Sequence, residues 1–323
     1  MRDDERGAAL LTVLLLVAVI SALAVAVLDD MRFGIRRAAN VRDQGQARWL
    51  ALGAEAMARG RLERLIQGSP DLTPLEAWSG RSLTLPGDDG ALIKVSAADA
   101  GDCFNLNSVV QGRGEYLIRR DEGVAQFIAL AEAVDIPRAR AEMLAAALVD
   151  WIDQDSFPSP RGAEDGAYAA GAPAYRTGNT LLADSSEVRA IRGFDAPTWR
   201  ALQPYVCVLP SSDLSPINPN ALTREDALLL SVITDGQLSP DRAAALIRAR
   251  PGGGWTSLEA FWGQPALAQI TPPPEALEQV RLTTHHARLR VQVRYQGAEI
   301  VLNSLFEAAG GRVRLVGRRW SAA

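Results

Sequence analysis

The chain has 323 residues, 48% of them hydrophobic, which is enough for two compact units with a buried core. Its formal net charge of −4 shows no basic excess and argues against binding a nucleic-acid backbone as the main task. The 2 cysteines form no CxxC pair, which excludes a zinc ribbon or a thioredoxin-type site. Cys103 and Cys207 can pair if the body of the chain is exported. Such a bridge would close a loop of about 100 residues, worth at most about 4–5 kcal/mol.

The N-terminal segment is a charged leader followed by an apolar run. The leader MRDDERG ends at Gly7, and Ala8–Leu28 contains no charged residue. About 20 apolar residues cross the hydrocarbon core, so this run is long enough to span a membrane. A secretory signal remains an alternative because Ala22–Ala24 and Ala24–Ala26 fit its cleavage site, and so does a plain anchor. The flanking charges fit the positive-inside rule poorly.

From Asp29 to Gln67 the chain remains compatible with a helix. Apolar residues recur at helical spacing between charged ones, and Gly68-Ser69-Pro70 is a stop signal. Anchor and stalk are therefore predicted to form one helix of roughly 60 residues, about 90 Å long. The alternative is a membrane helix followed by a separate amphipathic one, with breaks at Gly34, Gly45 or Gly53.

Strand patterns lie on both sides of a helical middle. Arg81–Pro86 and Ala91–Ala97 predict a hairpin around the turn Gly87–Gly90. Three later segments alternate apolar and polar residues as half-buried antiparallel strands do: His286–Gln296, Glu299–Ala308 and Arg312–Trp320. One small sheet with a helical domain inserted between its strands accounts for this order. The predicted fold class is α+β.

The helical middle contains a weak internal repeat. FNLNSVV at Phe104–Val110 and INPNALT at Ile217–Thr223 both place Asn-x-Asn before a helical region. The second resembles SAM-like and helix-hairpin-helix modules, so we expect two related subdomains, 104–210 and 211–283. We interpret the asparagines as caps or Asx-turns. Helix-hairpin-helix modules often grip phosphates, but residues 211–270 hold more acidic than basic side chains, which disfavours DNA binding.

The richest polar stretch is LVDWIDQDSFPSPRGAEDGAYAAGAPAYRTGNTLLADSSE. Asp150 and Asp153 lie one helical turn apart, and a Pro- and Gly-rich loop follows. An all-oxygen set suits a hard cation, Ca²⁺ before Mg²⁺, and lacks the ligands that zinc favours. Alternatively, these acids are solvated, cap helices or pair with arginines. Two carboxylates could also serve acid–base catalysis, but no nucleophile, zinc-protease or phosphate-loop motif accompanies them, so we expect no enzyme.

At the N-terminus, an Arg-Gly leader before an apolar helix resembles a type IV prepilin signal, which prepilin peptidase would cleave between Gly7 and Ala8. That family usually carries Glu at the fifth mature position, where this chain has Thr12. This departure, together with the large body, resembles the K-type minor pseudopilins of type II secretion, the GspK family.

The resemblance implies a type IV pilin-like fold in seven segments: leader 1–7, transmembrane helix 8–28, periplasmic helix 29–67, first sheet part 68–103, subdomains 104–210 and 211–283, and closing strands 284–323. It implies calcium in the insertion, because its WxDxD-like and GxED segments match this chain. The ligands would be Asp153, Asp155, Glu164 and Asp165, with Asp150 and Asn179 weaker.

The resemblance also implies a structural role. The chain would be methylated at Ala8, cross the bacterial inner membrane once and hold its C-terminal body in the periplasm. It would cap the pseudopilus tip with the I and J minor pseudopilins, next to other pseudopilins and the inner-membrane assembly platform. The alternative is a membrane-anchored periplasmic adaptor outside secretion, for instance a DNA-binding protein in DNA uptake.

Overall fold

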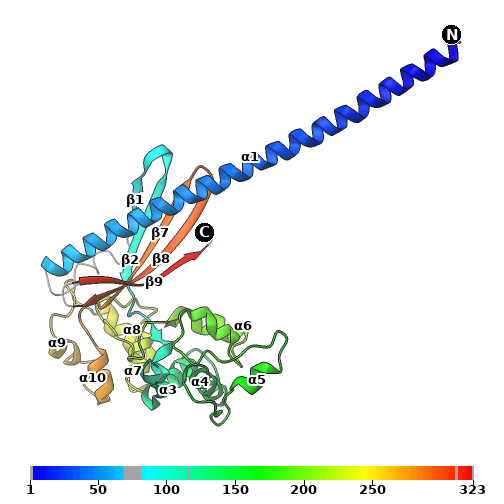
Figure 1. The fold of residues 1–323 in the computed structure, drawn as a ribbon. Helices are drawn as coiled ribbons and strands as arrows, with labels where there is room; N and C mark the ends of the chain where they lie inside the picture. The colour runs from blue at the N-terminus through cyan, green and yellow to red at the C-terminus, as the bar shows by residue number, and fades with distance from the viewer. Residues whose placement is uncertain (1–2, 69–81, 115, 310–311, 322–323) are drawn as a thin grey trace.

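The computed structural model describes residues 3–68, 82–114, 116–309 and 312–321. Met1 and Arg2 of the leader, residues 69–81 and the last two residues lie outside the described residues. The first element is α1 (Asp3–Gly68), one continuous helix of 66 residues. The single-helix prediction is confirmed, and the alternative breaks at Gly34, Gly45 and Gly53 do not occur. The N-terminal half of α1 projects away from the body and is apolar and long enough to cross a membrane (Figure 1).

The pilin-like body contains a five-stranded antiparallel sheet with the order β1-β2-β7-β8-β9. The strands are β1 (Ser82–Pro86), β2 (Leu92–Asp99), β7 (His286–Tyr295), β8 (Ala298–Ala309) and β9 (Arg312–Ser321). β1 and β2 form the predicted hairpin, and the three predicted closing strands pair in sequence order. The α+β fold class is therefore confirmed.

One face of the sheet packs on α1. Small side chains of the helix, among them Ala47 and Ala51, are fully buried against Leu289, Val291 and Val293 of β7. Their small size lets the helix axis approach the sheet closely, while the alternating polar side chains of β7 point to the opposite face. The sequence pattern thus fixes both the strand and the face that α1 covers.

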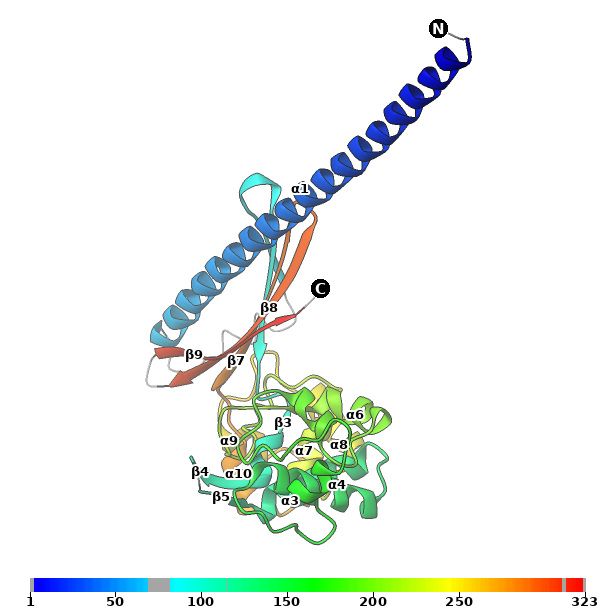
Figure 2. The ribbon, with the colours of Figure 1, turned by 45° about the vertical axis from the view of Figure 1, so that its right-hand side comes forward.

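The insertion between β2 and β7 is mostly helical. Its α-helices are α3 (Asp121–Ala133), α4 (Arg138–Ile152), α5 (Asp165–Ala169), α6 (Ala196–Leu202), α7 (Leu228–Ile233), α8 (Pro240–Arg248), α9 (Leu258–Trp262) and α10 (Pro274–Gln279). It also holds two small sheets that the sequence did not predict, formed by β3 (Phe104–Asn105) with β6 (Val206–Cys207) and by β4 (Val110–Arg113) with β5 (Tyr116–Arg119). One continuous core runs through the insertion. The insertion lies at the end of the sheet away from the projecting half of α1 (Figure 2).

The two Asn-x-Asn motifs have the same local structure. Asn105 accepts a hydrogen bond from the backbone of Asn107, and Asn218 accepts one from the backbone of Asn220. The second asparagine of each motif then holds a distant backbone through its side-chain amide: Asn107 bonds both the N–H and the C=O of Leu182, and Asn220 those of Trp255.

The residue before each motif also pairs in the same way. Phe104 pairs in parallel with Val206, and Ile217 pairs in parallel with Val280. Each motif therefore joins the beginning of its segment to its end. The structural reading of the asparagines is confirmed, and the two segments share a local design.

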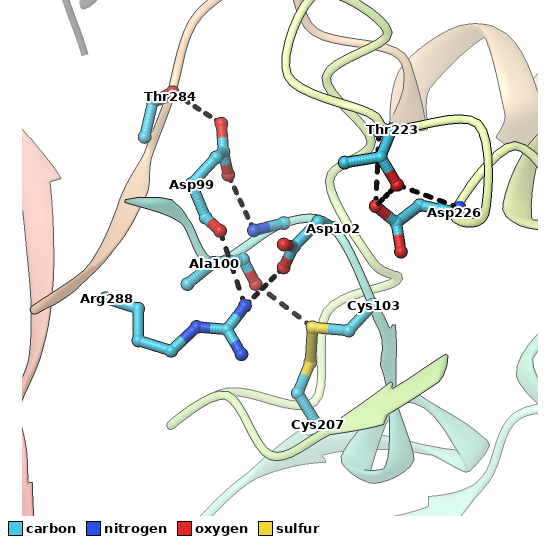
Figure 3. Close-up of polar contacts among 10 residues, drawn as sticks. Asp99, Ala100, Asp102, Cys103, Cys207, Thr223, Asp226, Thr284 and Arg288 are labelled. Atoms are coloured by element: carbon cyan, nitrogen blue, oxygen red, sulfur yellow. Dashed lines mark hydrogen bonds and ion pairs between the residues drawn. A yellow bond between two sulfur atoms is a disulfide. The ribbon is translucent and has the colours of Figure 1, made fainter. Parts of the chain in front are cut away.

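Two chain crossings connect the sheet to the insertion (Figure 3). Asp99, at the end of β2, is buried and accepts hydrogen bonds from the backbone of Gly101, from Asn218 and from the hydroxyl of Thr284. A Cβ atom on Gly101 would lie 2.3 Å from the carbonyl oxygen of Pro216, so glycine is needed there. Next to this junction, Cys103 and Cys207 form a disulfide, as the sequence allowed.

Candidate metal centre

The acidic loop begins where α4 ends. The helix is buried over its last turns, and Asp153 is its C-cap, with its N–H bonded to Val149. The chain returns to the same place at Glu164, which is the N-cap of α5. The end of one helix and the start of the next therefore bring carboxylates together that are separated in sequence by a Pro-rich loop.

Three of the predicted ligands meet at this point. Asp153, Asp155 and Glu164 each offer one oxygen atom, and these atoms lie within 4.8 Å of one another. Asp153 and Glu164 are buried, whereas Asp155 is exposed. Asp153 Oδ1 and Glu164 Oε1 are buried without a hydrogen-bond partner among the described residues. Buried carboxylate oxygens that lack a donor require a proton or a cation.

The pKa shifts of the cluster also indicate that its carboxylates need a proton or a cation. Burial raises the pKa of Asp153 to about 7, and the neighbouring charges of Asp155, Asp150 and Glu164 add to the shift. Burial also raises the pKa of Glu164, with Asp150 as the next cause. The protein thus holds several carboxylates close together where their negative charges repel.

Asn179 and Asp150 lie beside the cluster in different situations. The backbone N–H of Asn179 donates a hydrogen bond to the carbonyl of Trp151. The side-chain Oδ1 of Asn179 is buried without a partner among the described residues. Asp150 is fully buried, and both its oxygens accept from the backbone N–H of Ser159, at 3.2 and 3.1 Å. Asn179 therefore has a buried acceptor without a partner among the described residues, and its ligand role stays a prediction, whereas Asp150 holds the loop.

Asp165 is directed elsewhere. Its Oδ1 accepts hydrogen bonds from the backbone N–H and the hydroxyl of Thr177, both at 2.9 Å, and these bonds lower its pKa. Its Oδ2 lies 3.8 Å from Arg176. The structure therefore places Asp165 outside the group of three, and its ligand role stays a prediction.

Three aromatic side chains of the acidic loop and its flanking helices pack on one another, and the sequence analysis did not predict this cluster. The rings of Trp151 and Tyr168 meet edge to face with centroids 5.2 Å apart, and Tyr175 packs on both. Thr177 was missed as well, although it holds Asp165. The loop has no periodicity, so no pattern in the sequence indicates which of its side chains meet.

The oxygen-only set has a clear chemical preference. Carboxylate and amide oxygens in an irregular loop suit Ca²⁺, which accepts six to eight flexible oxygen ligands. The side chains Asp153, Asp155, Glu164 and Asn179 would supply part of that set. The group of three contains no histidine or thiolate, which are the ligands that softer metals such as zinc favour.

Fold and site together define a pilin-like protein with an N-terminal helix that fits a single membrane anchor and a helical insertion that carries an acidic loop. Family models described as "Type II secretion system (T2SS), protein K" match residues 102–211 and 217–284. Type II secretion system protein K of Pectobacterium carotovorum subsp. carotovorum is 35% identical over 323 residues, covering 99% of this chain and 98% of that protein. The Klebsiella pneumoniae protein of the same name is 36% identical, with the same coverage. The chain belongs to the type II secretion system protein K family.

A solved structure agrees over most of the chain. GspK in the crystal structure of the GspK-GspI-GspJ complex from the type 2 secretion system of enterotoxigenic Escherichia coli superimposes with a TM-score of 0.77 at 28% identity. The match covers 89% of this chain and 100% of that chain. The arrangement of helix, sheet and insertion is thus common to both proteins.

Proposed function

We propose that the chain is a minor pseudopilin that caps the tip of the type II secretion pseudopilus together with I- and J-type partners. The observation that carries this proposal is the match to GspK, a protein solved in complex with GspI and GspJ, over 89% of this chain. The architecture supports it physically. The insertion lies beyond the end of the sheet and would overhang neighbouring subunits, so another subunit stacked above would meet it.

The same proposal implies how the N-terminal segment is processed and where it lies. Prepilin peptidase would cut between Gly7 and Ala8, methylation would follow at Ala8, and α1 would first lie in the inner membrane and then pack in the filament. The body would occupy the periplasm, where the disulfide can form. Thr12 replaces the usual Glu at little cost, because a capping subunit has no neighbour above it whose amine this Glu would meet.

Co-purification tests the partnership. The full chain is co-expressed with the I- and J-type pseudopilins and prepilin peptidase of the same bacterium, extracted in detergent and purified through a tag on the I-type protein. We expect a stable complex of all three, and a mature chain whose intact mass begins at Ala8. Absence of the chain from the complex, or a start near Val25 or Val27, would contradict the proposal.

We assign calcium to the acidic loop as part of this function. Support comes from three carboxylate oxygens within 4.8 Å, from the two buried oxygens without donors and from the free Oδ1 of Asn179. A cation there would relieve the repulsion and join α4 to α5, so the ion would act as a structural clamp. No catalytic role is assigned to the chain, because its family is a component of a secretion apparatus.

Calorimetry on the detergent-solubilised full chain tests the calcium assignment. We expect Ca²⁺ uptake, a higher Tm with Ca²⁺ and a lower one after chelation, because a ligand that binds only the folded state stabilises it. Asp153→Asn and Glu164→Gln should each weaken binding by at least about tenfold. Glu259→Gln, an exposed site on α9, should leave it unchanged. Equal Ca²⁺ binding by all three variants would refute the site.

The DNA-binding alternative has no specific observation in its favour. Arg250, a cation of the helix-hairpin-helix-like segment, is bound to the carbonyl groups of Pro219, Asn220 and Leu222. A salt-sensitive mobility shift of labelled DNA by the full chain would revive this alternative.

A further inference from the structure

The face of the sheet opposite α1 carries a hollow of about 440 Å³ over β1, β2 and β7. We call it the basic hollow. The polar and charged side chains that line it are Ser82, Lys94, Ser96, Arg288, Arg290 and Gln292. In the register of the sheet, Lys94 stands opposite Gln292 and Ser96 opposite Arg290, so the two cations Lys94 and Arg290 are diagonal neighbours on adjacent strands. No carboxylate lines this hollow in the described part of the chain.

Most arginines of the sheet pair with a carboxylate, whereas two cations of the basic hollow do not pair with any described residue. Arg294 pairs with Glu299 at 3.1 Å and Arg314 with Glu307 at 2.6 Å, and Arg318 and Arg319 also pair with carboxylates. Arg288 at the rim of the hollow pairs with Asp102 at 2.5 Å. Lys94 and Arg290 are exposed, and neither forms an ion pair with a described residue. The sheet therefore neutralises most of its arginines and leaves two neighbouring positive charges in one hollow.

This arrangement has a cost and a chemical preference. Like charges at neighbouring positions of adjacent strands repel, which opposes folding slightly. The same two charges, with the hydroxyls of Ser82 and Ser96 beside them, favour anionic groups that accept hydrogen bonds, whereas the amide of Gln292 already donates to Glu299. Arg290 offers a planar fork that fits a carboxylate, and Lys94 offers a point charge. A volume of about 440 Å³ accommodates a few side chains, which an extended acidic segment would supply.

We propose that the basic hollow docks an acidic peptide segment of a partner protein, with carboxylates paired to Lys94 and Arg290. Charge complementarity identifies this occupant. Because α1 packs on the opposite face of the sheet, the helix does not cover the hollow, whether α1 lies in a membrane or against other helices. The site is independent of the acidic loop, which belongs to the insertion.

The single lysine of the chain makes the test specific. Lys94 is the only lysine in the sequence, so a carbodiimide can join a bound carboxylate to just one side chain. The probe is a fluorescent ten-residue peptide that alternates Glu and Ser, and its control has Gln in place of Glu. We expect the acidic peptide to couple to Lys94 of the detergent-solubilised full chain, and mass spectrometry of the digested product to locate the bond. Binding should weaken as salt increases.

Matched variants separate the hollow from general charge. Lys94→Gln and Arg290→Gln should each weaken binding of the acidic peptide by roughly threefold to tenfold in fluorescence anisotropy. Arg312→Gln removes the same charge from β9 outside the hollow and should have no effect. All three side chains are exposed, and an unchanged Tm will show that the variants fold.

Three outcomes would overturn the proposal. The first is equal binding of the acidic and neutral peptides, and the second is an equal loss of binding in Arg312→Gln. The third is a single-stranded oligonucleotide that binds as tightly as the peptide and depends on the same two residues, since the hollow would then be a phosphate site.

Discussion

Gly162 shows at the scale of a residue how closely the acidic loop is built around Asp150. A Cβ atom on Gly162 would lie 1.9 Å from Asp150 Oδ2, a distance at which something must move. Asp150 is fully buried and already holds Ser159, so it has little room to give way. The glycine of the GxED segment is therefore required by packing, which the sequence alone could not show.

We predict that Gly162→Ala destabilises the folded chain by about 1–3 kcal/mol, as overpacking of a tight site does, and weakens Ca²⁺ binding. Chemical denaturation with and without Ca²⁺ measures both effects. Gly166→Ala is the matched control, because a Cβ there meets nothing within 4 Å and the residue lies in α5. An equal effect of the two substitutions would argue against this account.

Asp102 makes stability depend on pH. Burial raises the pKa of Asp102 to about 6, Asp226 and Asp99 add to the shift, and Arg288 opposes it. The folded state therefore keeps a proton that the unfolded state releases near pH 4, so this contribution to stability is present at low pH and is lost as pH rises to about 6. Its full size is at most about 3 kcal/mol.

Asp102→Asn should remove that slope. Between about pH 4 and pH 6, the free energy of unfolding of the parent chain should fall relative to that of the variant. Urea titrations at several pH values measure the difference. Other carboxylates, including those of the acidic loop, titrate in both proteins and cancel. Parallel profiles for the two proteins would show that Asp102 has an ordinary pKa.

At the scale of elements, Glu55 joins α1 to the sheet. This side chain of α1 is buried and accepts hydrogen bonds from Ser304 of β8 and from Arg318 of β9, the latter through Nε at 3.1 Å. In the sequence Glu55 is one acid among the charged residues of a helical stretch. Only the packing of α1 on the sheet distinguishes it from its exposed neighbours.

We expect Arg318→Ala to destabilise the protein by about 1–3 kcal/mol, because it removes a charged hydrogen-bond donor from the buried carboxylate of Glu55, while Arg318 itself is partly exposed. Adding Glu55→Gln should recover part of that loss, and urea unfolding of the single and double variants measures the coupling. As a control, Arg314→Ala breaks the surface pair with Glu307 and should cost about 0–1 kcal/mol. Comparable losses from the two alanine variants would rule out a special role for Glu55.

At the scale of the whole molecule, one disulfide closes most of the first subdomain. Cys103 and Cys207 are 104 residues apart, and the bond lies beside the pairing of β3 with β6. In the chain-entropy model a loop of this length is worth at most about 4.7 kcal/mol. The bond lies next to the junction with the sheet, so it ties the end of the first subdomain to the place where the chain leaves β2.

Replacing both cysteines by serine should lower the Tm of the full chain, with the loss concentrated in the insertion. Hydrogen exchange should increase in β3 and β6, while the closing strands β7 to β9 keep their protection. A reductant should lower the Tm of the parent chain and leave that of the variant unchanged. A parent chain indifferent to reductant would mean that the bond contributes nothing.

The sequence by itself determined the elements whose signals are local. The apolar run and its helical continuation specified α1, and the alternation of β7, β8 and β9 specified three strands and the face that is buried. Local chemistry also indicated that the asparagines were caps or Asx-turns, and it predicted oxygen ligands in the acidic loop. These features follow from periodicity and from the properties of single residues.

The tertiary structure decided which distant residues meet. It brought Glu164 back to Asp153, turned Asp165 toward Thr177 and paired Glu55 with Arg318. Among the described residues, it left Lys94 and Arg290 without an ion pair to a carboxylate. The two short sheets of the insertion also depend on long-range pairing, because strands of two to four residues are too short to show a period. A contact between residues far apart in the chain depends on how whole elements pack, and no local pattern records it.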